Sequence, residues 1–465
     1  MEARATASPP WLAARRRAAW DAFGALPMPR SAVDEDYRRT DIGALRIDRF
    51  STAASPDGDD AIIEAMRKRR DAAAPEAAWL ANTATGVRAI EGADALAAQG
   101  VIVCSLEVAA DRHAELLQRG LASLGAGDSK FIALWNALWQ GGCFVYVPKS
   151  VDAAIPLWVT HVASAPSSAI FPATVALLDD NSSLTLFETY ASPAGDQPLF
   201  SDAVTALWLG RDARLDYCTL QQWGGGAWHV ATHRAGVGAN AQLRFFGATL
   251  GARLQKVYWD ALLEGQGAAV DITGVCFGDR QQHLDHQSLQ AHRAPQTHSD
   301  LLLKVAVRDQ ARSVYSGLVD VDKVAQQTDG YVANRNLILG HGAKADSVPR
   351  LEIRANDVRC GHGATAGHID DEQRFYLQSR GVPREDADRL IVRGFMEDAL
   401  ARVPHAGFAT LVGRLMDEEI AGHAQLGVDA DGATAEAEAG GSAAEAGPDL
   451  EDMPEATRTT AATFG

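Results

Sequence analysis

The chain has few cysteines and lacks the paired spacings that build a disulfide framework or a self-contained metal centre. Its 465 residues include five cysteines, at positions 104, 143, 218, 276 and 360, and no CxxC pair. A zinc or cluster site made by one chain brings closely spaced thiolates together. The sequence therefore argues against both kinds of site, and a reducing cytoplasm is the expected compartment.

Basic charge, long apolar runs and common catalytic motifs are also scarce. The net charge of −17 disfavours nucleic acid as a partner, because phosphate binding needs a basic surface. No apolar run approaches the roughly 18 residues of a membrane span. An H-E-x-x-H helix, a G-x-S-x-G elbow and a P-loop are all missing, so hydrolysis by these motifs and ATP binding have no support. We expect neither a nucleic-acid nor a membrane partner.

Acidic charge is concentrated at the C-terminal end of the chain. From Asp429 onward there are nine acids and one base, so this segment carries −8 and the rest of the chain −9. Alanine, glycine and glutamate dominate it, and large apolar residues are almost missing. Such a composition cannot bury a core. We predict that residues 427–465 form a disordered, acidic, low-complexity tail.

The rest of the chain divides by its hydrophobic pattern into three regions. Apolar residues at helical spacing predict an N-terminal helical region over residues 1–100. Short β-prone runs bounded by turn residues predict a β domain over residues 101–368. Helical patterns return in residues 369–426. For residues 1–20, which are rich in alanine and arginine, we favour an amphipathic helix over an organelle transit peptide.

Helix boundaries are well marked in the C-terminal region. Asp370 or Asp371 can cap a helix, and Gly381 suits the position just past its end. Pro383 then opens a second helix. We expect that helix to carry one broad apolar face, formed by Leu390, Ile391, Phe395 and Ala399.

A weak internal repeat runs through the β region. A turn, a small residue and an apolar residue recur, with the apolar positions at Leu184, Leu215, Leu243 and Val270. Looser echoes occur at 310–314 and 342–348. Turns and strands that recur every 20–50 residues are typical of a solenoid, in which each rung buries its apolar face against the next. A β-sandwich with similar loops is the alternative.

The densest group of candidate ligands is rich in histidine. Its members are His283, Asp285, His286, His292 and His298. On a strand, His283 and Asp285 would face one side and His286 the other, so they could not all converge on one metal ion. We interpret them as solvated or hydrogen-bonded residues of a sheet. The alternative is a metal- or polysaccharide-dependent β-helix enzyme that uses His283, His286 and His292.

A second candidate metal site is the motif Cys360-Gly361-His362-Gly363, at the point where the β pattern changes to a helical one. Cysteine and histidine are common ligands of iron and zinc. Strand alternation would put Cys360 and His362 on the same side. Two donors do not complete a metal site, so the alternative is a strand-end histidine that is hydrogen-bonded to the backbone.

Several separated stretches between residues 30 and 420 are informative together. They are 35–40 (EDYRRT), 128–137, 141–148, 297–300, 311–317, 327–337, 345–353, 359–367 and 375–381. In this order, they resemble the SufB/SufD family of iron–sulfur cluster assembly proteins, and its SufD branch in particular.

The resemblance implies a mainly β protein, a flattened right-handed parallel β-helix flanked by N-terminal and C-terminal α-helical regions. It also implies a non-catalytic subunit of an ATPase-driven SufBCD complex. Such a subunit pairs with SufB through the β-helix and binds the SufC ATPase through its C-terminal helices. The corresponding helix residues here are Phe375, Tyr376, Arg380, Leu390, Ile391 and Phe395.

Two positions favour the SufD branch over a SufB-type cluster-binding scaffold, which is the alternative. SufB-like chains carry glutamate after the histidine and cysteine where this chain has Asn334, whereas Gly363 follows His362 here. By resemblance, His362 faces SufB and supplies one ligand to a transient iron or nascent cluster, and Cys360 lies beside it. We expect no cofactor bound stably by this chain alone. The resemblance leaves open a flavin in the complex and a homodimer of the isolated chain.

Overall fold

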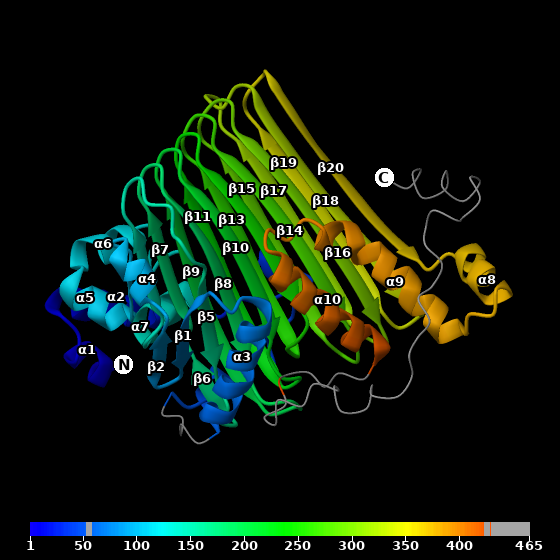
Figure 1. The fold of residues 1–465 in the computed structure, drawn as a ribbon, viewed down its shortest axis with the longest axis horizontal. Helices are drawn as coiled ribbons and strands as arrows, with labels where there is room; N and C mark the ends of the chain where they lie inside the picture. Colours follow the sequence, from blue (N-terminus) through cyan, green and yellow to red (C-terminus); the bar gives the residue numbers. More distant parts are fainter. Residues whose placement is uncertain (53–57, 423–427, 429–465) are drawn as a thin grey trace.

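Two stacked β-sheets form most of the protein (Figure 1). This computed structural model describes residues 1–52, 58–422 and 428. Within them, sheet I contains, in spatial order, β2 (Gly86–Glu91), β1 (Ala78–Thr83), β5 (Leu157–Val162), β8 (Ser183–Ala191), β10 (Arg214–Gln222), β12 (Gln242–Thr249), β14 (Ala269–Gly278), β16 (His298–Arg308), β18 (Thr328–Leu339) and β20 (Val358–His368). Sheet II contains β19 (Lys344–Ile353), β17 (Arg312–Val321), β15 (His283–His292), β13 (Leu254–Leu263), β11 (Ala227–Val237), β9 (Leu199–Leu209), β7 (Ala173–Leu178), β4 (Cys143–Val147) and β3 (Ile102–Cys104), with β6 (Ser168–Ile170) paired to β9.

The chain winds through these sheets as a solenoid. From β7 onward, successive strands alternate between sheet II and sheet I, and each strand pairs in parallel with the strand two places later in the sequence. Antiparallel pairs occur at the N-terminal end, between β1 and β2 and between β3 and β4. The predicted mainly β solenoid with flanking helices is confirmed.

The internal repeat corresponds to the stacking of rungs in sheet I. Its four apolar positions are in register on neighbouring strands, in the order Leu184, Leu215, Leu243 and Val270. All four side chains are buried. The looser echoes at 310–314 and 342–348 mark the starts of β17 and β19, which belong to sheet II. These two echoes therefore lie at a different corner of the solenoid from the four repeated apolar positions.

Residues with a left-handed backbone conformation turn the chain at the corners that precede the sheet I strands of the repeat. Asn181, Asp212 and Asn240 have φ values of 56°, 57° and 55°, and Gly267 has 73°. Asparagine, aspartate and glycine tolerate this backbone region better than other residues. The turn signals that flank the repeat are therefore the residues that make each corner.

The main core fills the space between the two sheets. Inward-facing side chains of both sheets form one apolar cluster, which includes the fully buried rings of Tyr217, Trp223 and Tyr315. Each rung contributes side chains that pack against the rungs before and after it, as in other solenoids. The end rungs are therefore the places where this core can reach solvent.

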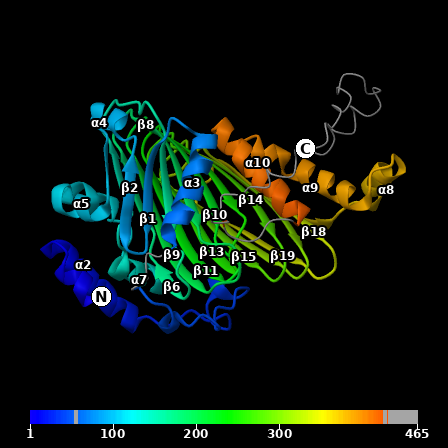
Figure 2. The same ribbon diagram turned by 60° about the horizontal axis from the view of Figure 1, so that its bottom comes forward.

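N-terminal helices cover the outer face of sheet II. The ring of Phe131 packs against Phe200 of β9, and the indole N–H of Trp135 donates to the carbonyl oxygen of Pro172 at 2.8 Å. Figure 2 shows α2 below this part of the solenoid. The helices of the N-terminal half are α1 (Glu2–Thr6), α2 (Pro10–Ala25), α3 (Asp59–Ala73), α4 (Asp94–Ala98), α5 (Leu106–Arg112), α6 (Ala114–Gly120) and α7 (Lys130–Leu138), with 3-10 turns at Glu35–Tyr37 and Ile47–Arg49.

C-terminal helices pack on the outer face of sheet I together with α3 (Figure 1). They are α8 (Asp371–Ser379), α9 (Arg384–Leu400) and α10 (Ala406–Ala421). Phe408 of α10 is fully buried and stacks on Phe187 of β8 with ring centroids 5.0 Å apart. In contrast, α8 lies beyond the edge of the sheet and buries no residue.

The helix boundaries predicted near the C-terminus agree with the structure. The Asp370 side chain accepts a hydrogen bond from the Glu372 backbone N–H at 2.8 Å, and Gly381 has a φ of 88° just past α8. Helix α9 begins directly after Pro383. Across the described residues, no helix is long and apolar enough to cross a membrane. The predicted acidic tail, 427–465, lies outside the described residues except for position 428.

Two strands lie in the first hundred residues, which the sequence predicted to be helical. All six residues of β1 are buried, because sheet I continues on both sides of it and helices cover it. A strand buried on both faces loses the alternation of apolar and polar residues. Conversely, α5, α6 and α7 lie inside the stretch 101–368 that was predicted to be β.

Candidate functional site

The last rung of the solenoid leaves a free edge on both sheets. Among the described residues, β19 and β20 are the final strands of sheets II and I, and each pairs with one neighbour, β17 or β18. Neither strand contains a fully buried residue. A free strand edge presents unpaired N–H and C=O groups to which another chain can pair. This open end, formed by β19 and β20, is a candidate protein-binding surface.

Cys360 and His362 lie on the same side of β20, as strand alternation predicted. Their partners in register on β18 are Gly330 and Val332. Cys360 is half-buried and packs against the end of the cluster between the sheets. His362 is exposed. The pair therefore lies where the solenoid core meets solvent.

The glycines beside His362 make room for an aromatic ring on the opposite side of β20. A Cβ added at Gly363 would lie 2.9 Å from the hydroxyl oxygen of Tyr331, and one at Gly361 would lie 3.5 Å from its ring. Tyr331 itself is 47% exposed. The imidazole of His362 therefore lies on one side of β20, and the ring of Tyr331, a residue of β18, lies against the glycines on the other side.

The donor set at this end is small. Burial raises the pKa of the Cys360 thiol, so the thiol is protonated at neutral pH, whereas a metal ligand must be a thiolate. Throughout the described part of the chain, no three His, Cys, Asp or Glu side chains are grouped so that they could hold a metal ion. A four-coordinate site that used His362 and Cys360 would need donors from another molecule.

Asn334, at the position where the resemblance expects a cysteine in SufB, is buried inside the solenoid. Its Nδ2 donates to the carbonyl oxygen of Leu303 at 3.3 Å. The Nδ2 of Asn336 donates to its Oδ1 at 2.7 Å. The amide is therefore satisfied within the last rungs and adds no metal ligand.

The histidine-rich group does not converge on one point. Each of the three histidines considered as ligands of an enzyme site has its own hydrogen-bond partners: His283 has Thr40 at 2.9 Å, His286 has Thr249 and Gln255 at 3.2 Å, and His292 has Thr297 at 2.8 Å and Ser299 at 3.0 Å. These contacts match the interpretation of the group as hydrogen-bonded residues of a sheet.

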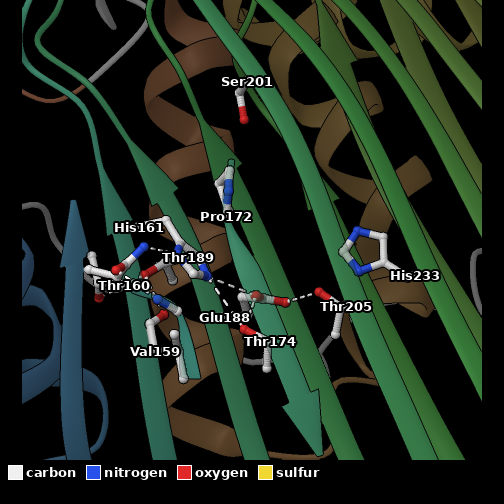
Figure 3. A network of polar contacts seen from close by, with 12 residues as sticks. Val159, Thr160, His161, Pro172, Thr174, Glu188, Thr189, Ser201, Thr205 and His233 are labelled. Atoms are coloured by element: carbon white, nitrogen blue, oxygen red, sulfur yellow. Dashed lines mark hydrogen bonds and ion pairs between the residues drawn. The ribbon is translucent and has the colours of Figure 1, made fainter. Parts of the chain in front are cut away.

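Sequence reasoning missed a polar network inside the solenoid (Figure 3). Glu188 of β8 is fully buried, and its carboxylate lies 2.9 Å from Nε2 of His161. It accepts hydrogen bonds from Thr174 at 2.5 Å and Thr205 at 2.6 Å, and from the hydroxyl of Tyr217. These residues come from five different strands, so no local motif could have revealed them. A glutamate in a strand of apolar residues and threonines was the one available signal.

The network keeps the buried carboxylate ionised. Burial alone would raise the pKa of Glu188, but the hydrogen bond and charge of His161, the charge that His233 gains below about pH 4 and the Thr174 hydroxyl together lower it to about 2. A buried charge is tolerated when its partners and hydrogen bonds replace water. We infer that the network fixes the strands around β8 in one arrangement.

Stability should fall as the pH drops from about 6.5 to about 4. Burial lowers the pKa of His233, His283, His286 and His292 from 6.5 to about 4. In this range the unfolded chain binds protons that the folded chain does not, so stability is complete above pH 6.5 and is lost on acidification. Glu419, whose pKa burial raises to about 8, acts in the opposite direction but is a single group.

The midpoint of urea unfolding, measured at several pH values, tests this expectation. The slope of the unfolding free energy against pH is proportional to the number of protons taken up on unfolding. Replacement of His286 by glutamine should reduce this number by about one. Gln266→Ala, at an exposed position without a titratable side chain, provides the control and should leave the slope unchanged. A midpoint that stays constant from pH 7 to about 4.5 would contradict the assignment of neutral buried histidines.

The residues predicted to bind an ATPase divide into two groups. Phe375, Tyr376 and Leu390 are 71%, 42% and 52% exposed, respectively. Ile391 and Phe395 are half-buried and pack against the outer face of sheet I. The broad apolar face predicted for α9 is therefore split, since the sheet takes one part of it and Leu390 points elsewhere.

Arg380 belongs to the exposed group at the end of α8. Its guanidinium carbon lies 4.5 Å from the ring centroid of Tyr376. An arginine over an aromatic face is a cation–π arrangement, which is worth about 0.5–1 kcal/mol at exposed sites. The contact holds both side chains on one side of α8.

Fold and site together define the class of the protein, a two-sheet parallel β-solenoid with helices on its outer faces and an open last rung. The family models described as "SufBD protein N-terminal region" and "SUF system FeS cluster assembly, SufBD core domain" match residues 86–159 and 161–395. The chain belongs to the SufBD family of iron–sulfur cluster assembly proteins. The matched descriptions name this family without separating SufB from SufD.

Similar proteins carry the same family description. An "Iron-sulfur cluster assembly SufBD family protein" of Staphylococcus epidermidis is 29% identical over 325 residues, which cover 70% of each chain. Proteins of Staphylococcus haemolyticus and Staphylococcus aureus are 29% and 28% identical over the same length and coverage.

Proposed function

We propose that this chain is a SufD-type, non-catalytic subunit that supports iron–sulfur cluster assembly in a complex with SufB and the SufC ATPase. The observation that carries the proposal is an exposed imidazole, His362, on the free edge strand of the solenoid. That edge can pair with a second solenoid, and the imidazole would then lie at the junction. Gly363 and Asn334, which stand where SufB-like chains have glutamate and cysteine, favour SufD over SufB.

A divided site suits the chemistry of cluster assembly. His362 can supply one nitrogen ligand, and Cys360 can add a thiolate if the partner lowers its pKa or iron displaces the proton. The remaining ligands would come from SufB. Iron or a nascent cluster is then the cargo of the interface and not a cofactor of this chain. A movement of either subunit could open such a site and release the cargo.

The C-terminal helices suit a second partner. Exposed Phe375 and Tyr376 lie on α8, which projects beyond the edge of sheet I (Figure 1), and exposed Leu390 lies on α9. Clustered exposed aromatic and aliphatic side chains mark protein-binding surfaces. Half-buried Ile391 and Phe395 connect this surface to sheet I, so a movement of the ATPase could be transmitted to the β-solenoid.

Replacement of His362 by alanine should lower cluster assembly in cells by at least about tenfold, because an iron ligand at the interface is lost. Folding and complex formation should be unchanged, since the side chain is exposed. The assay uses cells in which this chain is the sole copy and measures the activity of an iron–sulfur enzyme, together with co-purification of SufB and SufC.

His298→Ala is the matched control, since His298 is an exposed histidine of β16, which β18 separates from the edge strand β20. Normal maturation of the enzyme with His362→Ala would refute the interface role. Failure of the unaltered chain to co-purify with SufB and SufC would refute the SufD assignment itself. A homodimer of the isolated chain that SufB dissociates would agree with the proposal, because both partners would use the open end.

A further inference from the structure

A basic pocket lies between the N-terminal segment and the outer side of sheet II. Its volume is about 330 Å³, and residues 31–44 of the N-terminal segment form one wall. The starts of successive strands of sheet II form the other wall. The charged and titratable side chains that line it are Arg38, Arg39, Asp41, Arg253, His283 and Arg312. Arg312 of β17 brings the pocket next to β19, whereas the C-terminal helices lie on the outer face of the other sheet.

Buried contacts fix the N-terminal wall. The Nζ of Lys256 donates to the carbonyl oxygen of Asp36 at 2.7 Å and to Asp285 at 2.7 Å. The ring of Tyr37 lies 4.6 Å from the same Nζ, and the hydroxyl of Thr40 donates to Asp285. Tyr37 and Thr40 are therefore anchored inward, and the two arginines between them line the pocket.

The strand wall follows from the register of the solenoid. Leu254, His283 and Arg312 are neighbours in register at the starts of β13, β15 and β17. Arg253 precedes β13 directly. Adjacent strands are about 4.8 Å apart. The stacking of rungs therefore delivers an imidazole and two guanidinium groups to one wall.

Two of the four arginines lack a carboxylate partner. Arg38 pairs with Glu35 at 2.7 Å, and Arg312 pairs with Asp346 at 2.6 Å. Arg39 and Arg253 make no ion pair with any described residue, and Arg253 instead lies 5.7 Å from the ring centroid of Trp228.

Asp41 is the one carboxylate among the lining residues. Its Oδ1 accepts a hydrogen bond from the backbone N–H of Gly43 at 2.8 Å. The chain as a whole carries a net charge of −17. A concave surface with two unpaired guanidinium groups is therefore a local exception to the charge of the protein.

We propose that this pocket binds the phosphate group of a small anionic ligand. Guanidinium groups present planar, fixed donors that match phosphate oxygens two at a time, and such charge-assisted bonds are strong. The volume lies at the lower end of the range of small-molecule pockets, which suits a phosphate or a mononucleotide better than a polymer. This binding site is additional to the proposed role in cluster assembly.

Calorimetric titration of the full-length chain tests the site, with inorganic phosphate and adenosine monophosphate as separate probes. We expect saturable binding that weakens at least tenfold, about 1.4 kcal/mol, in the double variant Arg39→Gln/Arg253→Gln. Arg214→Gln, an exposed arginine at the start of β10 in sheet I, is the matched control and should change affinity less than about twofold. The single variant Arg253→Gln, at an exposed position, should show a weaker form of the same loss without any risk to folding.

Saturable binding of inorganic phosphate by itself would support the proposal and identify free phosphate as sufficient. Binding of the nucleotide without binding of phosphate would also support it and identify a phosphate ester as the ligand. The proposal is overturned if neither probe saturates below about 10 mM at low ionic strength. It is equally overturned if both arginine variants bind like the unaltered chain.

Discussion

Loss of the Lys256 ammonium should lower the free energy of unfolding by about 3–5 kcal/mol, because it leaves the Asp285 carboxylate buried without its counter-charge. Both side chains are 0% exposed, and the nitrogen and oxygen are 2.7 Å apart. Breaking a buried pair from one side is far more damaging than losing a pair at the surface, since water cannot replace the missing partner. Lys256→Ala is the variant to measure.

The same substitution should loosen the N-terminal segment. Lys256 also holds the Asp36 carbonyl and lies under the ring of Tyr37, so its removal deletes two contacts of this segment at once. Limited proteolysis should therefore cut near residues 30–50 faster in Lys256→Ala than in the unaltered chain. A stability loss without this change in cleavage would show that the ion pair does not anchor the segment.

Two control variants distinguish the effect of breaking the buried ion pair from the effect of losing any charged side chain. Arg244 forms a comparable pair with Asp216 on the surface, with its side chain 57% exposed, so Arg244→Ala should cost only about 0–1 kcal/mol. The double variant Lys256→Met/Asp285→Leu should be more stable than Lys256→Ala, because it leaves no unpaired charge. Urea unfolding measures all three, and equal losses in Lys256→Ala and Arg244→Ala would contradict the argument.

Phe375→Asp and Leu390→Asp should each strongly weaken binding of the SufC ATPase, if the proposed function is right. Side chains at the centre of an interface commonly contribute about 2–4 kcal/mol each, and a charge in an apolar contact adds a desolvation cost. Loss of 2–4 kcal/mol corresponds to a roughly 30- to 1,000-fold weaker complex. Folding should be unaffected, since Phe375 and Leu390 are 71% and 52% exposed.

Binding of the purified chain to SufC, measured with each single variant and the double variant, tests this expectation. Val108→Asp is the matched control, because Val108 is an exposed apolar residue of α5, at the opposite end of the solenoid in Figure 1. It should bind SufC like the unaltered chain. Unchanged affinity in the double variant would place the ATPase elsewhere on the protein.

Local signals predicted the C-terminal helix boundaries and the repeat because each depends on a few neighbouring residues. Asp370 caps α8, Gly381 ends it in the left-handed region, and Pro383 precedes α9. The repeated apolar position at Leu184 and Leu215 follows from turns that come at a nearly constant interval. These features require no knowledge of the rest of the fold.

Features that depend on distant neighbours escaped prediction. The sequence of β1 does not indicate a strand, because β1 is covered on both faces and its residues do not alternate between apolar and polar. The apolar face predicted for α9 included one residue too many. The sequence of the helix does not show where sheet I lies, and therefore does not show that Leu390 is exposed. The Glu188 network joins strands that are separated along the chain.

By itself, the sequence determined the class of fold, the family and the candidate pair Cys360 and His362, because turn residues, hydrophobic periodicity and short sequence motifs are local properties of the chain. Only the tertiary structure decided that His362 is exposed on a free strand edge while Cys360 touches the core. It also decided that four arginines from distant segments surround one pocket. Burial and charge depend on what the stacked rungs bring together, and that stacking places residues far apart in sequence side by side.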